Sequence, residues 1–157
     1  MRKRTRRKVY PLLNPIEHAI SGACISPEAD LNKLRVRELR AIENFRTGQA
    51  TLFDWENIKA LLNVAENMSR AGVGLEVLSV CMQAQDHLIE SAKRFQRIGK
   101  MGATGPALVC WQDLYEYHDL QRQSISRGEY ERFLMQAINR ERSMAPEVLA
   151  ITAESWK

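Results

Sequence analysis

Apolar residues recur at helical spacing along separate stretches of the chain, and capping residues divide each stretch from the next. The first long stretch opens with "SPEADL", in which Ser26 suits a helix cap and Pro27 suits the first turn. Gly48 follows the last apolar position, so the pattern predicts a helix over 27–46. The residues expected to face the interior are Leu31, Leu34, Leu39, Ile42 and Phe45.

A helical hairpin is predicted next. Thr51 suits a cap, Asp54 follows three residues later, and helical spacing continues to the glycines of "RAGVG". The spacing resumes at Leu75 and runs to Gly99, which predicts a second, longer helix antiparallel to the first. The expected interior residues are Trp55, Ile58, Leu61, Leu62, Ala65 and Met68, followed by Leu75, Leu78, Met82, Leu88, Ile89, Ala92 and Phe95.

Two further helices are predicted after "GKMGATGP", whose glycines indicate a loop. One begins at Pro106 and ends near Gln123; the other begins with a complete capping box, Ser126 with Glu129, and ends near Ser143. The loop lacks the preceding strand and the GxxxxGK[ST] spacing of a phosphate-binding loop, so no cofactor is expected. The expected interior residues are Val109, Leu114, Tyr117 and Leu120, then Tyr130, Phe133, Leu134, Ala137 and Ile138.

No stretch shows the alternation of a strand, so the predicted fold is an all-α, single-domain bundle of about five main helices. A short leading helix is expected over 14–22, because Asn14 suits a cap and Pro15 the first helical position. We therefore divide the chain into a basic N-terminal arm (1–13), a helical bundle domain (14–145) and a C-terminal tail (146–157).

The charge of the chain is concentrated in that arm. The whole chain has 23 Lys and Arg against 19 Asp and Glu, yet six of the basic residues lie within the first eight positions. Six cations near a phosphate backbone release condensed counterions, which predicts sequence-independent nucleic-acid binding. An acidic protein surface, an anionic membrane and a role in solubility alone are the alternatives. The six basic residues are Arg2, Lys3, Arg4, Arg6, Arg7 and Lys8.

The residue types of catalytic and metal sites are present but scattered. His18, His87 and His118 lie in different predicted helices, and none has a His or Cys at helical spacing, so no metal site is expected. Cys24, Cys81 and Cys110 form no CxxC pair and are expected to be small buried side chains. No catalytic motif appears and no apolar run is long enough to span a bilayer. We expect a non-enzymatic cytoplasmic protein of a bacterial host cell, with no membrane partner.

The segment "YEYHDLQRQSISRGEYERFLMQAINRER" joins two predicted helices by a short turn, which is the outline of a helix-turn-helix DNA-reading motif. Three residues of the second helix, Arg132, Gln136 and Arg140, share one face and are of types that contact bases or phosphates. The alternative is an ordinary helical hairpin with a solvated face, which is favoured by the acidic residues Glu129, Glu131 and Glu141.

Three blocks, "RKRTRRKVYPLLNPIEHAI", "LRVRELRAIENFRTGQAT" and "YEYHDLQRQSISRGEYER", resemble a family of small uncharacterised helical proteins of bacterial prophages and mobile elements. Some members of that family carry the label of Fis-type transcriptional regulators. The resemblance implies a phage or mobile-element context.

Two functions are then in contention. The first is a non-enzymatic regulatory protein that contacts nucleic acid, DNA in preference to RNA, through the arm. The second is a phage-encoded protein-binding inhibitor of a host complex, such as a CRISPR effector or the transcription machinery, in which the arm contacts an acidic host protein surface. Apolar stripes on a small bundle can pack within one chain or between two copies, so a homodimer stays open.

Overall fold

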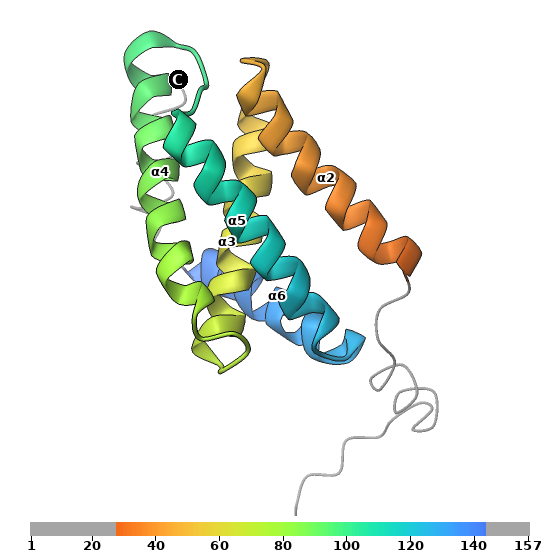
Figure 1. The fold of residues 1–157 in the computed structure, drawn as a ribbon. Coiled ribbons are helices and arrows are strands. Elements are labelled where there is room, and N and C mark those ends of the chain that lie inside the picture. The colour runs from red at the N-terminus through yellow and green to blue at the C-terminus, as the bar shows by residue number, and fades with distance from the viewer. Residues whose placement is uncertain (1–27, 144–157) are drawn as a thin grey trace, which may run out of the picture.

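Five helices make up the part of the chain that the computed structural model describes, residues 28–143 (Figure 1). They are α2 (Glu28–Arg46), α3 (Leu52–Arg70), α4 (Val77–Ile98), α5 (Gly105–Gln123) and α6 (Arg127–Ser143). No strand occurs in this range, so the expected all-α bundle is confirmed. The basic arm, the leading helix over 14–22, both expected domain borders and the tail lie outside the described residues.

Local capping interactions explain where these helices begin and end. The Ser126 backbone N–H donates to Glu129 Oε2 at 3.0 Å, and the Glu129 N–H donates to Ser126 Oγ at 3.2 Å, as the sequence predicted. Thr104 Oγ1 accepts the Ala107 N–H at 3.3 Å at the start of α5. Gly99 ends α4 with φ of 67°, a left-handed conformation that side chains disfavour.

The helix α3 is the centre of the bundle, because it packs against α2, α4, α5 and α6. Figure 1 shows α3 and α4 side by side and running in opposite directions, which confirms the predicted antiparallel pair. Trp55 of α3 donates its indole N–H to Leu88 O of α4 at 3.1 Å. Trp111 of α5 is fully buried and meets Phe45 of α2 edge-on, with ring centroids 4.9 Å apart.

Several expected interior residues are exposed instead, so the predicted register of α4 and α5 was partly wrong. The helices α4 and α5 bury small side chains, among them Cys81, Ala84, Ala107 and Cys110, beside the large Leu88, Trp111 and Leu114, and several of their other large apolar side chains are exposed. The inner face of α5 also carries the polar residues His118, Gln121 and Arg122, so its sequence resembles that of a solvent-exposed face. The corrected residues are Leu39, Leu75, Met82, Ile89, Val109, Tyr117, Leu120 and Leu134.

A buried ion pair joins α2 to α5. The guanidinium of Arg122 donates to both carboxylate oxygens of Glu38, at 3.0 and 2.8 Å, and also to Asp119 at 3.1 Å. Arg35 donates to the same Asp119 oxygen at 2.9 Å, which extends the network to the protein surface. Burial raises the pKa of Glu38 even though the charge of Arg122 opposes the shift.

A second buried polar group lies beside this pair. The Gln121 amide donates to Ser69 Oγ at 3.0 Å and to Val73 O at 2.7 Å, which ties α5 to the end of α3. The side-chain oxygen of Gln121, Oε1, lies 3.0 Å from His118 Nδ1. Burial, with the nearby charge of Arg122, lowers the pKa of His118 to about 3. His118 is therefore a neutral residue of the core.

Candidate nucleic-acid interface

The three α6 residues expected to contact nucleic acid are all exposed. Arg132, Gln136 and Arg140 follow one another at intervals of four residues, so they lie on one face of α6. The helix is anchored on α3 by Ala137, which packs in a cluster with Val64 and Met68. The structure thus brings the three predicted residues together on one face of a helix that the core holds in place.

The acidic residues of α6 are already engaged. Glu129 accepts hydrogen bonds from Ser126, Glu131 pairs with Arg127 at 2.9 Å, and Glu141 pairs with Lys59 of α3 at 3.0 Å. Within residues 28–143, neither Arg132 nor Arg140 makes a salt bridge. The acids that favoured a simple solvated face therefore do not neutralise these two arginines by direct pairing.

A second group of cations lies at the end of α4 and was missed in the sequence. Lys93, Arg94, Arg97 and Lys100 occur within "KRFQRIGK", which contains no acidic residue, and all four side chains are exposed. None forms a salt bridge with a carboxylate of the described chain. A count of charge by segment, instead of by chain, would have found them. We call these four residues the α4 basic cluster.

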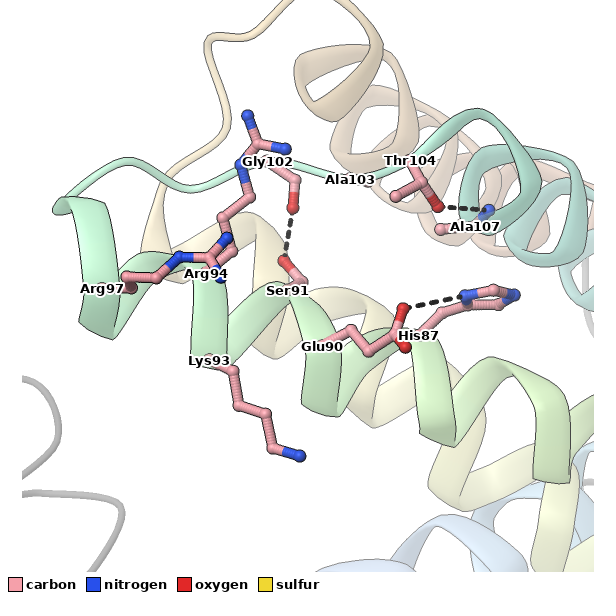
Figure 2. Close-up of a pocket in the computed structure, with 10 residues that line it drawn as sticks. All are labelled: His87, Glu90, Ser91, Lys93, Arg94, Arg97, Gly102, Ala103, Thr104 and Ala107. Carbon is pink, nitrogen blue, oxygen red and sulfur yellow. Dashed lines mark hydrogen bonds and ion pairs between the residues drawn. The ribbon is translucent and has the colours of Figure 1, made fainter.

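The α4 basic cluster borders a pocket of about 310 Å³ between the last turns of α4, the α4–α5 loop and the first turn of α5 (Figure 2). Ser91 Oγ donates to Gly102 O at 2.8 Å and holds the loop over α4. The Arg94 side chain rises beside Gly102, and Arg97 lies along α4 toward Arg94. Lys93 also lines the pocket, but its ammonium points away from the loop, whereas Arg94 stands beside the loop and Arg97 lies toward Arg94.

His87 and Glu90 line the same pocket, one turn of α4 apart. His87 Nδ1 lies 3.9 Å from a Glu90 carboxylate oxygen, too far for a hydrogen bond. This nitrogen is shielded from solvent and has no hydrogen-bond partner among the described residues. The pocket therefore has His87 and Glu90 at one end and two arginines at the other.

The potential metal ligands of the described range, 28–143, do not converge on one site, and the cysteines of this range are buried. No three His, Cys, Asp or Glu side chains of residues 28–143 converge as metal ligands. Cys81 and Cys110 are buried as expected, and burial raises the pKa of Cys81 to about 12, so its thiol stays protonated. His18 and Cys24 lie outside the described residues.

Comparisons with known proteins add no further identification: no family model, no curated protein and no solved structure matches the chain. The resemblance to phage and mobile-element proteins accordingly stays a prediction. Among the described helices, none has both the length and the apolar character needed to cross a membrane.

Proposed function

We propose that the protein is a non-enzymatic regulatory protein of a phage or mobile element that contacts nucleic acid through its basic arm. The observation that carries the proposal is the segregation of charge. Residues 1–13 hold six basic residues and no acidic one, whereas residues 28–143 hold equal numbers of each. An arm of this composition on a neutral body is an electrostatic anchor for a polyanion.

The proposal has a quantitative consequence for salt dependence. Each phosphate neutralised by Lys or Arg contributes a slope of about −0.9 to log K against log salt for duplex DNA, so six contacts give a slope of about −5. Single strands give a shallower slope, about −0.7 per contact. Binding by the arm alone is expected to be insensitive to base sequence, because phosphate contacts position a protein without reading bases.

The exposed face of α6 supplies the second contact in this proposal. Arg132 and Arg140 carry no competing salt bridge within the described residues, and Gln136 lies between them with an amide that can pair with adenine. The arm then provides affinity and α6 provides orientation on the polymer. Duplex DNA is favoured over RNA because its major groove admits a helix, whereas the deep, narrow major groove of RNA does not.

The test is fluorescence anisotropy with labelled duplex DNA, single-stranded DNA and duplex RNA across a salt series. The full-length protein is compared with a full-length variant in which the six basic arm residues are replaced by Gln. We expect the variant to lose most of its affinity and most of the salt slope. Arg37→Gln/Arg40→Gln, which removes two exposed α2 cations, is the control and should keep most of both. Equal affinity of the arm variant and the intact protein would rule out the proposal.

A second candidate function, a protein-binding inhibitor of a host complex, is favoured by the outer face of α5. Val109, Tyr117 and Leu120 are 63%, 42% and 62% exposed, and Asp113 and Glu116 lie between them on the same face. A helix face with apolar residues at both ends and acidic residues between them is complementary to a partner helix that carries apolar and basic residues. Pull-down of a defined host complex should then fail with Val109→Ser/Leu120→Ser, and retention by that variant would exclude this face.

A further inference from the structure

We propose that the pocket between α4 and α5 binds a phosphate group carried as a monoester. The site is built from residues of α4, the α4–α5 loop and α5, and the proposal does not depend on nucleic-acid binding by the arm. Its donors come from Arg94 and Arg97 of α4, with His87 on the opposite side of the Glu90 carboxylate.

The first argument is charge. Arg94 and Arg97 lie one turn apart on α4, and neither has a carboxylate partner within residues 28–143. Glu90 is the acid among the lining residues, and it lies beside His87, one turn before Arg94. Two guanidinium groups with uncommitted donors at one pocket favour a doubly charged anion, since paired N–H donors match the oxygens of phosphate.

The second argument is the way the loop accommodates Arg94. A Cβ built on Gly102 would lie 3.3 Å from Arg94 Nε, so a side chain at this position would press on the guanidinium. The Ser91 to Gly102 hydrogen bond of 2.8 Å fixes that stretch of loop on α4. Gly102 thus lets the exposed Arg94 guanidinium lie close against the loop at the edge of the pocket.

His87 and Glu90 define the other end of the pocket. Buried polar atoms are nearly always hydrogen-bonded, and His87 Nδ1 has no partner among the described residues. The imidazole ring lies on the same side of α4 as the pocket and lines it. Because this nitrogen is shielded and lies beside the Glu90 carboxylate, His87 forms the far wall of the pocket, and the two arginines hold the phosphate.

The dimensions and donors define the ligand class. A volume of about 310 Å³ is at the small end of ligand pockets and accepts a phosphate with a small organic group attached. The donors are arginine side chains, so the site is unlike a glycine-rich loop that holds phosphate with backbone N–H groups. A free phosphorylated small molecule and the 5′-terminal phosphate of a nucleic acid share this chemistry.

The test uses the full-length protein and two-dimensional amide NMR. Inorganic phosphate, added at constant ionic strength against chloride, should shift the Gly102 and Thr104 amide signals and reach saturation. Arg94→Gln/Arg97→Gln should weaken the apparent affinity at least about tenfold, because charge-assisted hydrogen bonds are lost. Arg37→Gln/Arg40→Gln removes two exposed cations at the same spacing on α2 and should bind phosphate like the original protein. Shifts that never saturate, or equal loss in both variants, would overturn the proposal.

Further probes separate the sources of the phosphate. A dinucleotide with a 5′-phosphate, the same dinucleotide with a 5′-hydroxyl and a small monoester are titrated in turn. Saturation by the phosphorylated dinucleotide but not by its 5′-hydroxyl form assigns the site to nucleic-acid ends. Saturation by a small monoester such as phenyl phosphate, but by neither dinucleotide, assigns it to small phosphorylated molecules. Saturation by inorganic phosphate but by no monoester would overturn the proposal. The arm variant should bind phosphate normally, so loss of DNA binding and loss of this site are distinguishable.

Discussion

Removing Arg122 is the perturbation whose effect on stability follows most directly from the structure. Arg122 and Glu38 are 1% and 4% exposed, and Arg122 spans both Glu38 oxygens with bonds of 3.0 and 2.8 Å. Arg122→Met keeps much of the side-chain volume but leaves the Glu38 carboxylate buried without its partner. Asp119 keeps its bond to Arg35 at 2.9 Å, so the main loss is confined to Glu38.

The expected cost is about 3–5 kcal/mol, the range found when one member of a buried ion pair is removed. A typical domain has only about 5–15 kcal/mol of stability, so the variant should be close to unfolding. The double variant Arg122→Met/Glu38→Leu removes both charges and should recover most of that cost. Arg70→Met, which breaks the exposed pair with Glu66 at 2.7 Å, is the control and should cost at most about 1 kcal/mol.

The assay is urea unfolding followed by circular dichroism, with the free energy of unfolding extrapolated to water. The pH dependence gives a second readout. Burial already raises the pKa of Glu38, and loss of Arg122 raises it further. When the pKa of a carboxyl is higher in the folded than in the unfolded protein, protonation of that carboxyl stabilises the folded state. The loss of unfolding free energy caused by Arg122→Met should therefore become smaller as the pH falls. A single variant as stable as the original protein, or a double variant no better than the single, would refute this reasoning.

Three smaller predictions follow from other buried or capping groups. The pKa of His118 is about 3 in the folded protein and 6.5 when unperturbed, so between these pH values only the unfolded chain binds the proton. The free energy of unfolding should therefore fall by roughly 1.4 kcal/mol for each pH unit between pH 6.5 and pH 3. His118→Gln should flatten that slope in urea titrations. Ser126→Ala removes the cap of α6 and should cost about 1 kcal/mol by the same assay, and an unchanged midpoint would contradict the capping role. In a Cys24→Ser background, Cys81 and Cys110 should react with a thiol reagent only as fast as the protein unfolds, and rapid labelling of the folded protein would show that they are not buried.

The helix boundaries could be predicted from the sequence because they depend on nearby residues. The pairs Ser126 with Glu129 and Thr51 with Asp54 act within one turn, and both make the expected bonds. The side chains that face the core depend instead on which helix packs where. On α5 the register was misjudged because Val109 is exposed while the polar Gln121 is buried. Apolar spacing alone does not reveal an inner face built partly from polar groups.

Some features of the candidate site likewise follow from local sequence, whereas others depend on the tertiary fold. Exposure of Arg132 and Arg140 on one face follows from their spacing and needs no tertiary information. The buried pair between Glu38 and Arg122 joins residues 84 positions apart, so no local pattern announces it. The pocket beside Arg94 also forms only when the loop folds back on α4, although the run of cations that borders it was visible in the sequence.

The central claim is that the arm anchors the protein on a nucleic acid, and the salt slope of duplex DNA binding tests it most directly. The measurement is the slope of log K against log salt for the full-length protein and for the six-residue Gln variant of the arm. The account predicts a slope of about −5 that falls to near zero in the variant. Absence of binding at low salt, or a slope that the arm substitutions leave unchanged, would contradict it.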